Sequence, residues 1–156
     1  MVHESSKPAG VVPPKGYSHV TVARGTRIVF IAGQVALDEA GNLIGGNSLE
    51  LQAERAFENL ERCLASIGAT MNDVTKINTY TVGYRPEHIP ILAAVRRRHL
   101  PAENPPAVTG VGVDALGGPG LLYEVDAIAV LTEDHGVRVG KESDMRDGTT
   151  SDQVQR

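Results

Sequence analysis

Two acidic residues interrupt an otherwise apolar stretch near the end of the sequence, over residues 121–131. The stretch predicts a β-strand, in which alternate side chains point to the same side, so Glu124 and Asp126 share one face. The two acids should lie about 6 to 7 Å apart along the strand. Either they belong to a structural ion pair, or Glu124 is an acid/base group that positions water in a cleft.

Other patterns that could carry chemistry are weaker. The five histidines lack the spacing of a metal site, and no Gly-x-Ser-x-Gly motif marks a nucleophile, so we predict neither a metal nor a cofactor. The glycine-rich segment 117–120 lacks the Lys-Ser/Thr of a phosphate loop and predicts a hairpin turn, with a ligand loop as the alternative. The basic run 96–99 predicts a solvated helix face, with anion binding or subunit bridging as the alternative.

The elements that must position these residues follow from hydrophobic periodicity. Residues 17–22 and 27–32 predict a β-hairpin, whose second strand is apolar on both faces. Apolar residues at three- and four-residue spacing predict a helix over 53–67, which Ser48 or Asn47 begins and Gly68 ends. Three more strands are predicted over 73–82, 107–113 and 121–131, and a second helix over 86–100.

This order of elements predicts an α+β fold. Two helices can cover only one face of the sheet, whereas the strand over 27–32 needs cover on both. A large exposed apolar surface marks an interface, so we expect the second face to meet identical subunits.

Length and charge narrow the class of protein. A chain of 156 residues corresponds to one domain, and its net charge of −4 argues against a nucleic-acid partner. No apolar run reaches the roughly 20 residues of a membrane span, and the start has no apolar leader segment, so we expect a cytoplasmic protein.

Both ends have the composition of tails. We predict a flexible N-terminal tail over residues 1–15, a domain over 16–131, and a polar C-terminal tail over 132–156. A short strand over 137–139 is the most structure that we expect in the C-terminal tail.

The domain resembles the RidA (YjgF) family over residues 16–131, in the family's order and spacing. The matching segments are Gly16-Tyr17-Ser18, Ile31-Ala32-Gly33-Gln34-Val35 with Leu37-Asp38, the helix 52–68, Asp73-Val74-Thr75-Lys76 and Tyr123-Glu124-Val125-Asp126-Ala127-Ile128-Ala129.

The resemblance implies a chorismate-mutase-like fold assembled as a homotrimer, with a cleft for a small-molecule ligand at each subunit interface. Family members hydrolyse 2-imino acids and their enamine tautomers to 2-keto acids and ammonia, without a cofactor. By the resemblance, Glu124 orients the water and Tyr17 is the cleft tyrosine. The substrate-binding segment that reads Ser-Gly-Gln in the family is Ala32, Gly33 and Gln34 in this chain.

One departure from the family bears directly on activity. The family's Pro-Ala-Arg-Ser/Thr-Cys segment, whose arginine clamps the substrate carboxylate, reads Pro106-Ala107-Val108-Thr109-Gly110 in this chain. Val108 and Thr109 are thus the expected substrate-binding residues, and Val108 cannot form the bidentate hydrogen bonds of a guanidinium. The chain therefore resembles an arginine-lacking branch of the family and should bind imino acids weakly.

Three functions compete at this point. The first is an imine or enamine hydrolase, a deaminase-like enzyme of altered or weak activity. The second is a non-catalytic ligand-binding or regulatory trimer, which Val108 favours. The third, the endoribonuclease activity attached to some family names, would need a basic surface for RNA, and the acidic balance of the chain argues against it.

Overall fold

The structure is a computed structural model that describes residues 3–6 and 8–132. In chain order the elements are β1 (His3–Ser6), β2 (Val20–Ala23), β3 (Arg27–Val35), α1 (Leu49–Ala65), the 3-10 helix η1 (Met71–Asp73), β4 (Val74–Val82), α2 (His88–His99), β5 (Ala107–Val113) and β6 (Tyr123–Leu131). The predicted order of strands and helices is confirmed from β2 onwards.

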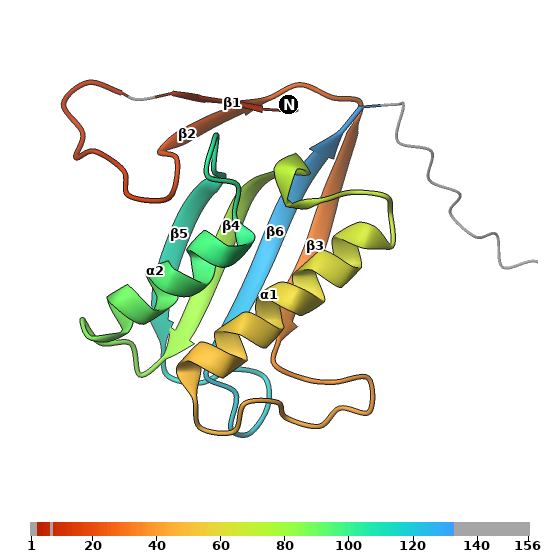
Figure 1. Cartoon of the computed structure of the whole chain (residues 1–156), viewed down its shortest axis with the longest axis vertical. Helices are drawn as coiled ribbons and strands as arrows, with labels where there is room; N and C mark the ends of the chain where they lie inside the picture. The colour runs from red at the N-terminus through yellow and green to blue at the C-terminus, as the bar shows by residue number, and fades with distance from the viewer. Residues whose placement is uncertain (1–2, 7, 133–156) are drawn as a thin grey trace, which may run out of the picture.

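Four strands form the main sheet, in the order β3-β6-β4-β5. β6 pairs antiparallel with both β3 and β4, whereas β4 and β5 run parallel. Both helices lie on the same side of this sheet (Figure 1). The predicted α+β fold with two helices on one face is therefore confirmed.

The core fills the space between the main sheet and the two helices. On β6 the side chains alternate, so that the odd-numbered residues are buried under the helices and the even-numbered residues face the other way. Residues of both helices and of one sheet face form a single apolar cluster. Its largest members include Phe57, Leu60, Leu64, Ile77, Leu92, Val95, Tyr123, Val125 and Leu131.

Helix α1 begins and ends at the predicted signals. The Ser48 hydroxyl accepts a hydrogen bond from the backbone N–H of Leu51 at 3.3 Å, which satisfies one of the free donors of the first turn. Gly68, with a φ of 72°, turns the chain away just beyond the last helical residue, Ala65. Across the described residues, no helix is both long enough and apolar enough to span a bilayer.

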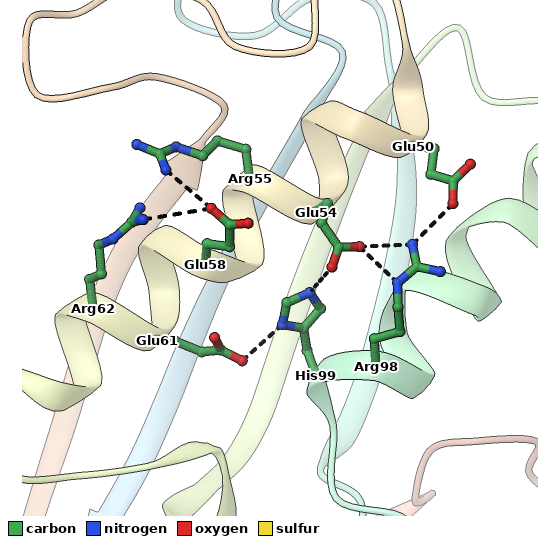
Figure 2. A network of polar contacts seen from close by, with 8 residues as sticks. All are labelled: Glu50, Glu54, Arg55, Glu58, Glu61, Arg62, Arg98 and His99. Carbon is green, nitrogen blue, oxygen red and sulfur yellow. Dashed lines mark hydrogen bonds and ion pairs between the residues drawn. The ribbon is translucent and has the colours of Figure 1, made fainter.

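Charged side chains tie α2 to α1 (Figure 2). The Arg98 guanidinium lies 3.0 Å from Glu50 and 2.8 Å from Glu54. The two ring nitrogens of His99 lie 2.9 Å from Glu54 and 2.8 Å from Glu61. The sequence predicts that the basic run 96–99 is a solvated helix face. This prediction is only partly right, because Arg98 and His99 of the run hold the two helices together.

The predicted hairpin between residues 17–22 and 27–32 is wrong. β2 pairs with β1, and β3 pairs with β6. Between them Gly25 lies against the end of β6, where an added Cβ would be 2.5 Å from the carbonyl oxygen of Leu131. This glycine therefore permits a close approach of two backbones rather than a hairpin turn.

The glycine-rich segment 117–120 does not form the predicted hairpin turn either. It connects β5 to β6, which are not neighbours because β4 lies between them. The buried Gln52 of α1 fixes the end of this loop, since its side chain donates to the carbonyl of Gly120 and accepts from the N–H of Leu122, each at 2.8 Å.

Strand β1 lies within residues 1–15, so the prediction of a flexible tail is wrong for residues 3–6. β1 pairs antiparallel with β2, and His3 is only 4% exposed, with Nε2 2.8 Å from the carbonyl oxygen of Asn104. Except for Thr132, the predicted C-terminal tail and its short strand over 137–139 lie outside the described residues.

The face of the main sheet away from the helices carries exposed apolar residues. Ile28 and Phe30 of β3 are 65% and 76% exposed, whereas Val29 and Ile31 pack against the core. β3 is therefore apolar on both faces, as predicted, and within one chain only one of them is covered.

Candidate functional site

Glu124 and Asp126 lie on the open face of the main sheet, the face without helices, as the alternation predicts. In the register of the sheet Glu124 stands opposite Tyr80 of β4, and Asp126 stands opposite Asn78. Both acids are half-buried. Because β6 is an inner strand, each acid can interact with side chains from the strands on either side.

Asp126 is held by its neighbours on β4. Its two carboxylate oxygens accept hydrogen bonds from the Asn78 amide at 2.8 Å and from the Tyr80 hydroxyl at 2.9 Å. The hydrogen bond to Asp126 is the main cause that raises the pKa of Tyr80 above its ordinary value of 10.0. Burial lowers the pKa of Lys76 below 10.5, although the charge of Asp126 opposes this shift. Asp126 therefore has the contacts of a structural acid.

Glu124 has a different environment. Among the described residues, no side chain or backbone group forms a hydrogen bond with its carboxylate. The carboxylate lies directly against the backbone of Gly33, because an ideal Cβ on Gly33 would be 1.8 Å from Oε1 of Glu124. A carboxylate with unused acceptor oxygens on a partly open surface can bind a water molecule or a substrate donor.

The segment that faces Glu124 is irregular. The register between β3 and β6 shifts between Ile31 and Gln34, so Ala32 and Gly33 have no partner residue in β6. Gln34 supports the distortion, since its side-chain amide donates to the carbonyl of Ala32 at 3.1 Å. Such irregularities occur next to active sites, where they free backbone groups and redirect side chains.

Tyr17 lies beside the first residues of β5, away from Glu124. The following residue, Ser18, bridges to Ala107, and its backbone N–H donates to the carbonyl of Pro106 at 3.0 Å. The Tyr17 ring packs edge-on against His19, with ring centroids 5.2 Å apart.

The two candidate residues of β5 point to opposite faces. Thr109 stands in register with Asn78 on the open face, where its hydroxyl accepts a hydrogen bond from Lys76. Val108 stands in register with the buried Ile77 and packs against the core on the side of the helices.

Within one chain, the predicted site residues therefore form two groups. Ala32, Gly33 and Gln34 lie beside Glu124. Thr109 lies on β5 and Tyr17 lies beside the start of β5, so β4 separates both residues from the strand that carries Glu124. Val108 shares no sheet face with Glu124, so a single chain does not bring the two residues together. Sequence reasoning missed Asn78 and Tyr80, although the alternation of β4 places both on one face.

The described residues contain no cluster of three His, Cys, Asp or Glu side chains that could hold a metal ion. A groove with a volume of about 580 Å³ runs between the 37–40 loop and α1. Its lining residues include Gln34, Arg55 and Cys63. Glu124 does not line this groove.

The fold and the sequence match known proteins over most of the chain. The profile of the family described as Endoribonuclease L-PSP matches residues 9–131. The structure of YyfB from Yersinia pestis, a Rid-family protein of unknown function, has a TM-score of 0.77 and 34% identity, and covers 84% of this chain and 100% of its own. RidA from a Psychrobacter species has a TM-score of 0.60 and 25% identity, and covers 84% of this chain and 99% of its own.

Two curated proteins are also similar in sequence. Protein DfrA of Myxococcus xanthus is 30% identical over 129 residues, which are 83% of this chain and 93% of the relative. A RutC family protein of Pyrococcus abyssi is 40% identical over 53 residues, a match that spans 33% of this chain and 41% of that relative.

The sheet order, the two helices on one face and the acid on an inner strand define an α+β protein of the Rid type. The chain belongs to the Endoribonuclease L-PSP family, which is the RidA (YjgF) family.

Proposed function

We propose that the protein is a cofactor-independent hydrolase of imines or enamines, with Glu124 as the residue that positions the attacking water. The observation that carries this proposal is the contrast between the two acids of β6. Asp126 uses both carboxylate oxygens in hydrogen bonds, whereas Glu124 makes none with the described residues and lies against the irregular segment at Gly33.

The reaction needs little more than a placed water molecule. Water adds to the carbon of the C=N bond, the nitrogen takes up protons, and ammonia leaves as the C=O bond forms. A carboxylate within about 2.6 to 3.2 Å of the water can accept its proton and return it to the leaving nitrogen, a contribution of about 10²- to 10⁴-fold in rate.

The proposed substrate class follows from the absence of the family's arginine, which is replaced by Val108 in this chain. Val108 has no charge and packs toward the core, so it cannot bind a substrate carboxylate as the family's arginine does. A hydrogen bond to a charged group is worth about 1.5 to 3 kcal/mol, so the loss of a two-point clamp lowers specificity for imino acids by about two to four powers of ten. We therefore propose that imines without a carboxylate beside the C=N bond are the better substrates.

We further propose that the working form is a homotrimer with clefts shared between subunits. Two features support this. The open face of the sheet carries Ile28 and Phe30, 65% and 76% exposed, which is a surface typical of an interface. Moreover, Tyr17 and Thr109 are separated from Glu124 by β4 within one chain, and a neighbouring subunit could bring a second copy of them to its cleft.

The test measures ammonia and carbonyl product released from freshly generated imines, one with a carboxylate and one without, beside a relative that has the arginine. Glu124→Gln keeps the shape and removes the charge, so turnover should fall at least about 100-fold. The matched control is Asp126→Asn on the same strand face, which should lower thermal stability but leave turnover per folded molecule close to that of the wild type. Equal turnover by the wild type and Glu124→Gln would return Glu124 to a structural role.

Val108 supports a second candidate, a non-catalytic trimer that binds a metabolite. The same assay separates the two, because this candidate predicts no product from either imine, together with saturable binding that Glu124→Gln weakens. RNA cleavage is the third candidate, and the net charge of −4 argues against it.

A further inference from the structure

A small, enclosed cavity lies between α2 and the edge of the main sheet formed by β4 and β5, on the side of the helices. Its volume is about 50 Å³, and its lining includes Thr79, Thr81, Arg96 and Gly110. We propose that this cavity binds the carboxylate group of a short aliphatic acid, with Arg96 as the cation. Glu124 lies on the opposite face of the sheet, so this proposal does not depend on the hydrolysis proposed above.

Arg96 is placed to act inside the protein. It follows Leu92 by about one helical turn, and Leu92 is only 4% exposed, so both side chains start on the inner side of α2. The charge of Arg96 acts on the hydroxyl of the fully buried Tyr123. Among the described residues, no carboxylate forms an ion pair with Arg96, in contrast to Arg98. Its charge is therefore available to a ligand.

A buried hydroxyl close to the cavity is poorly satisfied. The Tyr123 hydroxyl lies next to Thr79 and Arg96, yet it makes no hydrogen bond of ordinary geometry with a described residue. Burial raises the pKa of Tyr123 to about 12, so the hydroxyl stays protonated and can donate. Thr79 is close enough to influence this hydroxyl but does not satisfy it with ordinary geometry, and a poorly satisfied buried hydroxyl is costly, so the Tyr123 hydroxyl remains able to donate to a ligand oxygen.

The chemistry of the cavity matches a carboxylate. A guanidinium and hydroxyl groups offer hydrogen-bond donors, and the planar fork of arginine fits the two oxygens of a carboxylate. A water molecule occupies about 30 Å³ in the liquid, so this cavity accepts a head group of a few atoms and not a whole metabolite.

Apolar side chains continue the lining toward the surface. Tyr84 and Ile89 also line the cavity, and they are 46% and 50% exposed. A hydrocarbon tail attached to the bound carboxylate would contact them. The combination of one cation inside and apolar residues outside therefore favours a short aliphatic acid over an inorganic anion.

The experiment is an NMR titration of the full ¹⁵N-labelled chain, in which the amide of Gly110 and the side-chain Nε–H of Arg96 are observed. Butanoate should give saturable shifts of both signals, and acetate should bind at least about fourfold more weakly because it lacks the buried methylenes. Butanamide, which has the same shape without the charge, and inorganic phosphate should give no saturable shift.

Variants identify the cation. Arg96→Gln should weaken butanoate binding about 10- to 100-fold, whereas Arg97→Gln, the exposed neighbour on the same helix, should leave it unchanged. Gly110→Val offers a second variant if Arg96→Gln fails to fold. Its Cβ would sit 3.4 Å from the Thr79 hydroxyl, and its methyl groups would fill the cavity, so it should abolish binding.

Three results would overturn the proposal. They are the absence of a saturable shift with butanoate, equal binding of butanoate and butanamide, and an undiminished affinity in folded Arg96→Gln. Tighter binding of phosphate than of butanoate would overturn the assignment to a carboxylate. Turnover by the Glu124 site is a separate readout, so failure of one proposal leaves the other testable.

Discussion

The carboxylate of Glu124 occupies the space that a side chain on Gly33 would need. An ideal Cβ on Gly33 would lie 1.8 Å from Oε1 of Glu124 and 2.6 Å from its carboxyl carbon. The conflict is with the far end of a flexible side chain and not with backbone, so the Glu124 carboxylate can move aside while the strands stay in place.

Gly33→Ala should therefore act on the site more than on the fold. We expect imine turnover to fall by at least about tenfold, since a displacement of about 1 Å can cost about a hundredfold in rate. The melting temperature should change little, in contrast to Gly25→Ala, whose Cβ would meet the backbone oxygen of Leu131 at 2.5 Å. Turnover assays and thermal unfolding of both variants check this. Unchanged turnover in Gly33→Ala would separate Glu124 from the reaction.

The contact between α1 and α2 should make stability depend on pH through Glu54. Burial by itself raises the pKa of Glu54, but hydrogen bonds from Arg98 and His99 outweigh it and hold the pKa below 4.5. The pKa of this carboxyl is lower in the folded chain than in the unfolded chain. Such a group stabilises the fold at pH values above its unfolded pKa, and this contribution is lost as the pH falls through its folded pKa.

Urea unfolding of the wild type and Glu54→Gln checks the pH effect. We expect the difference in their free energies of unfolding to be full at pH 7 and to shrink below about pH 4. Glu50→Gln is the matched control, because Glu50 is more exposed and surface ion pairs contribute little. A difference for Glu54→Gln that is the same at pH 7 and pH 3 would contradict the assignment.

The exposed apolar face of β3 should hold the trimer together. Light scattering of the wild type should give about three times the chain mass of 16.6 kDa. Phe30→Asp should dissociate it, whereas Leu51→Asp, which changes a residue 57% exposed on α1, should not. Circular dichroism confirms that the variants are folded. A wild-type monomer would remove both the assembly and the shared cleft.

The two ends of the chain should respond differently to trimming. Removal of residues 1–6 deletes β1, which pairs with β2, and the buried His3, so we expect a lower melting temperature, by about 2 to 4 °C for each kcal/mol lost. Removal of residues 133–156, which contain no Leu, Ile or aromatic residue, should change it little. Equal effects of the two truncations would contradict this expectation.

Local elements were predictable from the sequence because they depend on periodicity and capping. The apolar spacing between Ala53 and Leu64 and the cap at Ser48 predict α1, and the alternation of β6 predicts the shared face of Glu124 and Asp126. β1 was not predictable in this way. Its residues His3–Ser6 have no apolar alternation, and they are ordered by pairing with β2 and by a contact with Asn104, which lies far along the chain.

Strand pairing and side-chain direction were the harder part. Short glycine-containing breaks favour hairpins, but Gly25 and Gly120 serve contacts with Leu131 and Gln52, which are distant in the sequence. The face of Val108 was not predictable, because valine, threonine and glycine on β5 give no contrast between its two faces. The resemblance to the family predicts a functional role for Val108 but not the direction in which its side chain points.

The position of β6 in the middle of the sheet has a consequence for synthesis of the protein. The last strand of the described chain lies between β3 and β4, so the segments made earlier cannot complete their pairing until the chain has been made to Leu131. Until then, β3 and β4 each lack a neighbour, and unpaired strand edges are where nascent chains associate wrongly. The sheet is therefore complete only when β6, the strand that carries Glu124, has been made. A chain from a ribosome that stalls before residue 123 has neither a complete core nor its proposed catalytic acid.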